Sequence, residues 1–341
     1  MTGVPALARR PHEIARLEWP AVNPASGHAQ RFHEEAPLVL ASNTCYSGQT
    51  RAVQALRRHG RRARGWSSQR TLLAVHAHPD DETISMGGTL ARYSAEGVRT
   101  VVVTCTTGDL GEVREPGLRM DSVAAIRDRE LEAATRRLGV SRLVKLGYAD
   151  SGMAGWPENH RPGAFFAADL AEAAGRLVDV IRQERPQVMV AYDETGGYGH
   201  PDHLKAHQVA VAAFEASGEA RPARLYFVRI PRTWSRDFVR ALRAAGIDAP
   251  GSAAAGADAG PDVAEIGTPD DLATTQIDVR DYVPTKLAAL ACHRSQMAAD
   301  FFLMRMPLEL AQRLWAVEFF SREDDAPYQA GQESDLFAGL D

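Results

Sequence analysis

The chain has 341 residues, of which 45% are hydrophobic and 24% are charged, and its net charge is −5. This length allows one large domain or two of ordinary size, and the apolar share excludes a chain that is disordered throughout. With 28 Gly and 3 Cys, neither a collagen nor a disulfide scaffold fits the composition. The mildly acidic balance predicts no nucleic-acid or membrane partner, and no apolar run approaches the roughly 20 residues that a membrane helix needs.

The segment 1–70 differs from the remainder of the chain in charge and in regularity. It holds 11 Arg and 4 Glu, a net charge of +7, so the rest of the chain sums to −12. Arg9 and Arg10 resemble a twin-arginine export signal, but the apolar stretch of roughly 7–15 residues that such a signal needs does not follow. We expect a basic, weakly ordered extension over residues 1–70 and one folded domain over residues 71–341. A nucleic-acid-binding arm, or a start codon assigned too far upstream, is the alternative for the first segment.

The three cysteines, Cys45, Cys105 and Cys292, are widely separated and odd in number. They lack the paired spacing of a metal site, so we expect free thiols in a reducing compartment. The cytoplasm is the compartment that this pattern favours.

From residue 71 onward, short apolar runs alternate with segments of helical period. Buried strands are predicted at 71–76, 101–103, 143–146, 188–191 and 225–228, and helices at 87–96, 124–138, 166–184 and 204–214. Farther on, the sequence predicts a mobile excursion at 249–267, a strand at 275–279 and helices near 286–297 and 307–314. This alternation predicts an α/β fold of the Rossmann-like kind, a mostly parallel sheet with helices on both faces.

Five of the 11 histidines fall in two short segments, residues 75–82 and 196–207. Each segment follows a predicted buried strand directly. Because the carboxyl ends of parallel strands share one edge of a sheet, where binding sites form, we expect the two segments to meet in space although about 120 residues separate them.

The spacing within the two segments favours a catalytic metal ion. His78 and Asp81 are three residues apart, so a turn at the start of a helix can aim both at one point, while Asp80 diverges and can act on water. The second segment can supply His203 as a third ligand, with His200 on the rim. Three protein ligands and one water are typical of catalytic Zn²⁺, and the same ligands accept Fe²⁺.

The two segments resemble the LmbE-like family, also called PIG-L deacetylases, which are zinc-dependent N-deacetylases of amino sugars. The resemblance rests on AHPDDE at residues 77–82 and GYGHPDH at residues 197–203. It extends over residues 71–341, including the tail at 333–339, and does not cover the segment 1–70. The pattern is most similar to the mycothiol branch, which contains a deacetylase of the N-acetylglucosaminyl-inositol precursor and an amidase of mycothiol S-conjugates.

The resemblance implies the LmbE-like fold and a role for each motif residue. It makes His78, Asp81 and His203 the metal ligands, Asp80 the general base, His200 an oxyanion stabiliser or acid, Tyr198 a group that polarises the acyl oxygen, and Arg127 and Asp150 the residues that hold the sugar or inositol. For Arg127, a solvated helix charge is the alternative. Among the neighbouring residues, we expect His76 to be a packed core histidine, His207 to lie beside the site or on the surface, and Glu82 to brace the metal turn.

Two activities within the family compete. Conjugate amidases carry a Lys where this chain has Ser85, and Gly199 and residues 151–155 also favour the deacetylase. Residues 75–78 and 314–320 resemble the amidase instead. We therefore expect a zinc-dependent hydrolase that removes the N-acetyl group of N-acetylglucosaminyl-inositol, a small-molecule amino-sugar substrate. A mycothiol S-conjugate amidase, or another N-acyl amino-sugar deacylase of secondary metabolism, is the alternative.

Two further hypotheses lie outside this enzyme class. His78 and Asp80 with a distant His resemble the two-His-one-carboxylate triad of non-haem Fe(II) oxygenases, but that triad sits on all-β folds. A non-catalytic module that binds a metal or a sugar is expected to lack the base, whereas Asp80 is present.

Overall fold

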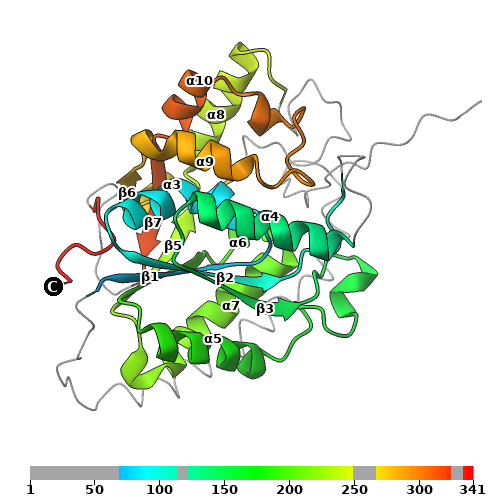
Figure 1. Cartoon of the computed structure of the whole chain (residues 1–341), viewed down its shortest axis with the longest axis vertical. Coiled ribbons are helices and arrows are strands. Elements are labelled where there is room, and N and C mark those ends of the chain that lie inside the picture. The colour runs from blue at the N-terminus through cyan, green and yellow to red at the C-terminus, as the bar shows by residue number, and fades with distance from the viewer. Residues whose placement is uncertain (1–68, 114–121, 249–265, 324–332, 341) are drawn as a thin grey trace, which may run out of the picture.

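A seven-stranded sheet forms the centre of the computed structural model, which describes residues 69–113, 122–248, 266–323 and 333–340 (Figure 1). Its strands are β1 (Thr71–His76), β2 (Arg99–Thr106), β3 (Arg142–Tyr148), β4 (Val188–Tyr192), β5 (Arg224–Arg229), β6 (Thr275–Asp278) and β7 (Val317–Arg322). They lie in the order β3-β2-β1-β4-β5-β7-β6. The first five pair in parallel, and β7 runs antiparallel to both β5 and β6. The predicted mostly parallel α/β sheet is confirmed.

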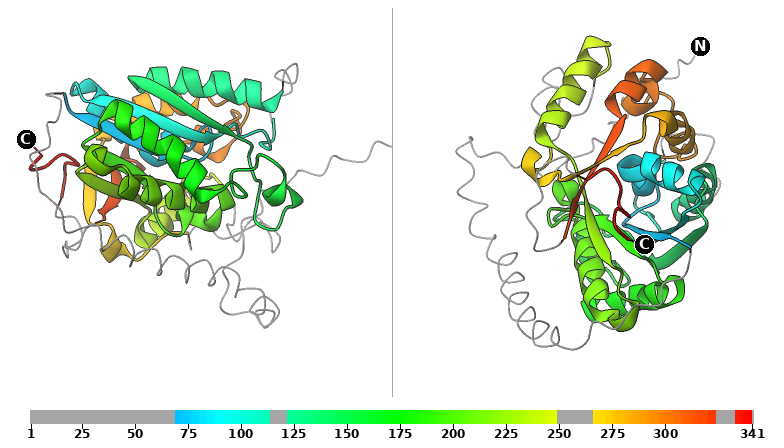
Figure 2. Two further views of the ribbon diagram at one scale, coloured as in Figure 1. Left: turned by 90° about the horizontal axis from the view of Figure 1, so that it is seen from below. Right: turned by 90° about the vertical axis from the view of Figure 1, so that its left-hand side faces the viewer.

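Helices cover both faces of the sheet. One face carries α3 (Asp81–Ala95), α4 (Val123–Arg137) and α9 (Val283–Leu290), and the other carries α5 (Leu170–Glu184) and α7 (Pro201–Ala216) (Figure 1). Two further helices, α8 (Arg232–Ala244) and α10 (Leu308–Leu314), share a smaller apolar cluster with α9. They lie together at one end of the molecule in Figure 1 and in the right-hand view of Figure 2.

The strand β1 joins the two halves of the core. All six of its residues are buried, as its continuous apolar run predicts. Leu73 and Val75 belong to the cluster that includes Leu177 of α5, whereas Leu72 and Ala74 belong to the opposite cluster. Both faces of β1 are therefore packed, and only its carboxyl end is left for chemistry.

Several element boundaries differ from the sequence-based prediction. The helix predicted from residue 87 begins at Asp81, and the one predicted from residue 204 begins at Pro201, so both start inside the histidine segments. The helix predicted from residue 166 begins at Leu170, since the Asp169 side chain accepts a hydrogen bond from the helix start. The helix predicted over 286–297 ends at Leu290. The sequence reading did not anticipate α8 and β7.

Some predictions concern segments that lie wholly or mostly outside the described residues. Most of the predicted extension, residues 1–68, lies outside the described residues, as does Cys45, and most of the predicted excursion, residues 249–265, does so as well. Cys105 and Cys292 are free thiols. Within the described ranges, no helix combines the length and apolarity needed to cross a membrane.

Candidate metal and active site

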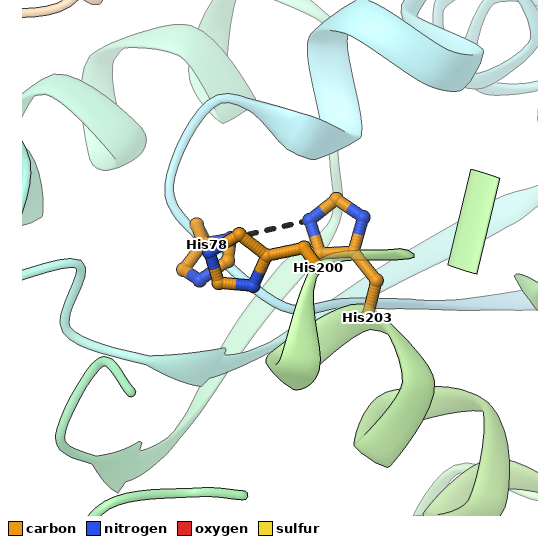
Figure 3. Close-up of side chains that lie close together, drawn as sticks. All are labelled: His78, His200 and His203. Carbon is orange, nitrogen blue, oxygen red and sulfur yellow. Dashed lines mark hydrogen bonds between the residues drawn. The ribbon is translucent and has the colours of Figure 1, made fainter. Parts of the chain in front are cut away.

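The two histidine segments meet at one edge of the sheet. They follow β1 and β4, which are neighbouring parallel strands, so their carboxyl ends lie side by side. Figure 3 shows the side chains of His78, His200 and His203 gathered at this edge. The predicted meeting of segments far apart in the sequence is therefore confirmed.

Three donor atoms converge on one point of this edge. His78 Nδ1 lies 3.1 Å from Asp81 Oδ2, His203 Nε2 lies 3.3 Å from the same oxygen, and the two ring nitrogens are 3.3 Å apart. Both histidines are buried. Two imidazole nitrogens and one carboxylate oxygen are a ligand set that Zn²⁺ uses in catalytic sites, so these residues fit the predicted metal.

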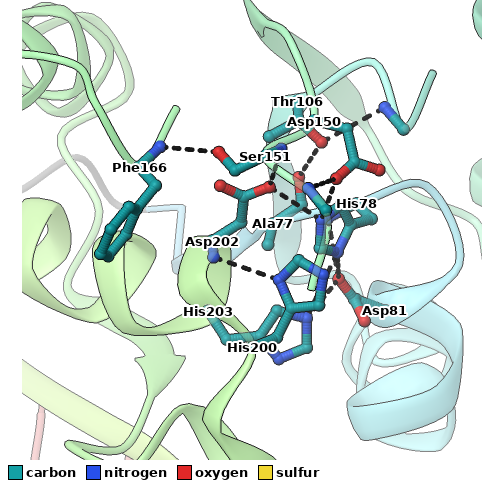
Figure 4. Close-up of polar contacts among 12 residues, drawn as sticks. Ala77, His78, Asp81, Thr106, Asp150, Ser151, Phe166, His200, Asp202 and His203 are labelled. Carbon is teal, nitrogen blue, oxygen red and sulfur yellow. Dashed lines mark hydrogen bonds and ion pairs between the residues drawn. The ribbon is translucent and has the colours of Figure 1, made fainter. Parts of the chain in front are cut away.

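A second group of donors lies on the other side of the His78 ring. His78 Nε2 is 3.2 Å from Asp202 Oδ2 and 3.7 Å from Asp150 Oδ1 (Figure 4). Two sets of donor atoms could hold a metal by proximity, His78 with His200 and His203, and His78 with Asp150 and Asp202. If Nδ1 of His78 were the ligand atom, Nε2 could donate to Asp202, and this contact would fix the ring as second carboxylates commonly do.

Asp202 is a site residue that the sequence reading did not single out. It is fully buried and accepts a hydrogen bond from the backbone N–H of Ser151 at 2.9 Å. This bond holds the segment that contains Asp150 next to the converging donors. Its Oδ1 has no hydrogen-bond partner among the described residues. Burial alone would lower the pKa of His78, but Asp150, Asp202 and Asp81 together raise it well above its ordinary value.

The backbone of Asp80 has an unusual conformation. Its φ is 117°, in the left-handed region that non-glycine residues rarely adopt. Its carboxylate contacts the Arg127 guanidinium at 3.2 Å. Burial raises the pKa of Asp80 to about 6, although Arg127 opposes this. Strained residues of this kind cluster at functional sites, which agrees with a catalytic role.

Arg127 is buried, so the reading of a solvated helix charge does not hold. Its guanidinium donates to the carbonyls of Gly108 and Pro79 at 2.9 and 2.6 Å and also contacts Asp80. A side chain would not fit at Gly108, where a Cβ atom would lie 2.4 Å from Arg127 Nη1. The predicted substrate contact of Arg127 stays a prediction.

His200 and Tyr198 lie beside the converging donors. His200 Nδ1 accepts a hydrogen bond from the backbone N–H of Asp202 at 3.1 Å. Burial, with His78 and His203 nearby, holds the pKa of His200 well below its ordinary value, so the ring is neutral and its proton is on Nε2. The Tyr198 ring centroid is 4.8 Å from that of His203. Both side chains therefore lie next to the predicted metal ligands, and their roles toward a substrate oxygen stay predictions.

The loop that carries Tyr198 is held by a buried ion pair. Asp193 accepts hydrogen bonds from the backbone N–H groups of Thr195 and Gly197 at 2.9 and 3.1 Å, and Arg229 contacts its other oxygen at 3.0 Å. Gly197 has φ 74°, which a residue with a side chain would adopt only under strain. The sequence offered no periodic signal for this support.

The sequence predicts roles outside the ligand set for three nearby residues, His76, His207 and Glu82. His76 is fully buried beside Tyr192, and burial lowers its pKa to about 4, as suits a neutral core histidine. His207 Nδ1 donates to the Tyr192 carbonyl at 3.0 Å. Glu82 is fully buried and contacts His293, a residue that the sequence reading missed.

A mostly parallel α/β sheet whose strand ends bring imidazoles and carboxylates together is typical of α/β enzymes with a binding site for a metal ion. Within that class, this chain belongs to the PIG-L family of deacetylases. The family model described as "GlcNAc-PI de-N-acetylase" matches residues 73–214.

Relatives of known name support the family assignment over most of the chain. A protein of Acidothermus cellulolyticus named 1D-myo-inositol 2-acetamido-2-deoxy-alpha-D-glucopyranoside deacetylase is 44% identical over 284 residues, which cover 80% of this chain and 96% of the relative. A protein of Streptomyces avermitilis with the same name is 43% identical over 294 residues, which cover 80% and 97%.

Among solved structures, the N,N'-diacetylchitobiose deacetylase of Pyrococcus horikoshii has a similar fold. The TM-score is 0.50 at 21% sequence identity, and the match covers 80% of this chain and 87% of the other. At this identity, the similarity supports the fold alone.

Proposed function

We propose that this chain is a zinc-dependent hydrolase that removes the N-acetyl group of 1D-myo-inositol 2-acetamido-2-deoxy-alpha-D-glucopyranoside, the N-acetylglucosaminyl-inositol of mycothiol biosynthesis. The observation that carries the proposal is the convergence of His78, Asp81 and His203 beside Asp80, in a chain 44% identical to a relative named for this activity. Fe²⁺ is the alternative metal, because the same ligands accept it. We also propose a cytoplasmic location, supported by free Cys105 and Cys292.

In this proposal, His78, Asp81 and His203 hold the metal. A bound Zn²⁺ polarises a carbonyl and lowers the pKa of water to about 7. Asp80 is the general base, since its carboxylate is buried beside these residues and its partner Arg127 favours the charged form.

The remaining groups act on the amide. Tyr198 and the Nε2–H of His200 donate hydrogen bonds to the acyl oxygen as negative charge develops on it. Asp80 takes a proton from the attacking water, and Asp80 or His200 gives a proton to the leaving nitrogen. The C–N bond breaks, and the products are acetate and the free amine. Arg127 and Asp150 are proposed to contact the sugar or inositol hydroxyls.

Acetate release from purified, zinc-loaded protein tests the proposal. We expect the inositol glycoside to yield acetate and a free amine in equal amounts. Mercapturate formation from a mycothiol S-conjugate, with no acetate from the glycoside, would support the amidase instead. Inactivity toward every N-acyl amino sugar would favour a non-catalytic binding module.

The metal is tested separately by chelation and reloading. We expect protein purified without oxygen to contain about one ion per chain, and chelated protein to regain its activity with Zn²⁺. An Asp81→Ala variant that keeps the wild-type metal content would contradict the ligand set.

A further inference from the structure

The peptide bond between Pro79 and Asp80 is held at both of its polar atoms. Its carbonyl oxygen, on Pro79, accepts a hydrogen bond from Arg127 Nη2 at 2.6 Å. Its N–H, on Asp80, donates to Glu82 Oε2 at 2.9 Å. Two partners on opposite ends fix the plane of this peptide, and they do so next to the left-handed φ of Asp80.

The carboxylate of Glu82 accepts hydrogen bonds from several described residues. Besides the Asp80 N–H, its carboxylate accepts from Thr83 Oγ1 at 2.6 Å and from His293 Nε2 at 2.9 Å. Glu82 and His293 are both completely buried. A buried carboxylate without its donors would carry a large desolvation cost, so the imidazole keeps Glu82 charged and in place.

His293 is held by an anchor of its own. It lies after the end of α9, and two residues later the backbone N–H and the hydroxyl of Ser295 both donate to Glu130, at 2.7 and 2.6 Å. Glu130 lies on α4, three residues after Arg127. One face of α4 therefore supports both ends of the Pro79–Asp80 peptide, directly through Arg127 and indirectly through the segment that carries His293.

We propose that His293 is a positioning residue for the general base. It holds the Glu82 carboxylate against the Asp80 N–H, and this contact keeps Asp80 in the left-handed conformation that sets its carboxylate beside Arg127. The inference rests on the proposed function for the role of Asp80, but the arrangement itself is a property of the backbone. Within the described ranges, the side-chain hydrogen bond of His293 goes to Glu82 and not to the converging donors.

Two variants of His293 separate its hydrogen bond from its volume. His293→Met fills the space without a donor, whereas His293→Gln keeps an N–H near the position of Nε2. We expect kcat for acetate release to fall about 10- to 100-fold in the Met variant, with KM within about twofold and an unchanged zinc content. The Gln variant recovers most of this loss. The buried Ser217→Ala, whose hydroxyl bonds Ala213 within α7, is the matched control and keeps wild-type kcat.

Crystal structures of the two His293 variants give a readout that needs no substrate. We expect the positive φ of Asp80 to be lost in the Met variant and kept in the Gln variant. An Asp80 that keeps its conformation without the His293 donor overturns the inference, as does wild-type kcat in the Met variant, a change in KM alone, or equal losses in both variants. If the wild-type protein releases no acetate, the proposed function fails, and the Asp80 backbone still decides the role of His293.

Ser295→Ala serves if the Met variant does not fold. It removes the hydroxyl contacts with Glu130 and with the Gln296 side chain, and we expect a severalfold lower kcat at unchanged KM because the segment with His293 loosens. A kcat equal to that of Ser217→Ala would overturn the inference.

Discussion

Asp80 differs from its neighbour Asp81 by environment, although both are aspartates of one turn. Asp81 faces two imidazoles, which lower its pKa well below the usual range against the effect of burial, whereas Asp80 faces a guanidinium and has a raised pKa of about 6. A carboxylate that stays charged suits a ligand, and one that is readily protonated suits a base. The two roles can therefore be tested apart.

Replacing Asp80 by Asn tests the base. An amide cannot take a proton from water, so we expect kcat to fall about 10²- to 10⁴-fold while the zinc content stays at the wild-type level. Asn tolerates a positive φ, which keeps the backbone intact. Asp81→Asn is the control, since it should lose metal as well as activity. Full turnover of metal-loaded Asp80→Asn would show that the base is another residue.

Arg127→Met separates the two roles open to this buried arginine. If Arg127 mainly sets Asp80 and the Pro79 carbonyl, with which it makes its observed contacts, kcat falls about 10-fold or more and KM changes little. A rise in KM at constant kcat would instead identify a sugar-binding group. Because Arg127 holds Asp80 and is also proposed to contact the sugar, we expect kcat to fall and KM to rise together in steady-state acetate release, and an unchanged KM would remove Arg127 from the substrate site.

The sequence could identify the motif residues but not the residues that support them. His78, Asp80, Asp81 and His203 stand in two dense segments after predicted strands, so strand order alone brings them together. His293 lies 211 residues from Glu82, in a segment predicted as helix that is no longer helical after Leu290, and only the packing of α9 against α3 and α4 makes them partners. Long-range contacts of this kind leave no local pattern in a sequence.

Dependence on long-range contacts also explains why the sequence did not predict the strand β7. The strand β7 contains Glu318, a charge that breaks the apolar run expected of a buried strand. Its compensation is remote, because Lys286 Nζ of α9 lies 2.7 Å from Glu318 Oε1. The other oxygen of Glu318 accepts the Thr89 N–H at 2.7 Å, where α3 resumes after the non-helical Met86. The first turn of α3 was also missed, because its first residues, Asp81 and Glu82, are polar and do not show the apolar spacing of a helix.

This ion pair predicts a large cost for Lys286→Met. The substitution leaves Glu318 charged and buried without its cation, so we expect the free energy of unfolding in urea to fall by about 3–5 kcal/mol. Arg240→Met on α8 is the control, since the exposed pair of Arg240 with Asp237 should contribute at most about 1 kcal/mol. Equal effects of the two substitutions would contradict the structural role of the buried pair.

The junction of α7 with β4 predicts a pH dependence of stability. Burial lowers the pKa of His207, although its bond to the Tyr192 carbonyl opposes this, so the folded protein binds this proton less readily than the unfolded chain does. Stability is therefore lost as pH falls through the ordinary histidine pKa of about 6.5, by at most about 1.4 kcal/mol per pH unit. His207→Asn keeps an N–H for Tyr192 and cannot titrate.

We accordingly expect the stability of wild type, relative to His207→Asn, to decrease from about pH 8 to about pH 5.5 in urea unfolding experiments. Subtracting the free energies of unfolding of the two proteins removes the contribution of all other titrating groups, because both proteins share them. Parallel stability curves would show that His207 titrates alike in both states.

At the scale of the whole molecule, the relatives bear on where the catalytic unit begins. They align with 80% of this chain but with 96% and 97% of their own length, and residues 1–68 make up a fifth of the 341 residues. Described structure starts at residue 69, and the Arg70 carbonyl already accepts the Arg99 N–H at 2.8 Å, beside the start of β2. A cut before Gln69 therefore keeps every described contact.

We predict that a chain beginning at Gln69 keeps kcat/KM within about twofold and the melting temperature within a few degrees of the full chain. A cut that also removes β1 is the control, and it should prevent folding because β1 pairs with both β2 and β4 at the centre of the sheet. Activity and thermal unfolding of the three chains check this. A clear loss in the chain from Gln69 would assign the segment 1–68 to the catalytic unit, because the described contacts alone would then not account for its stability or its turnover.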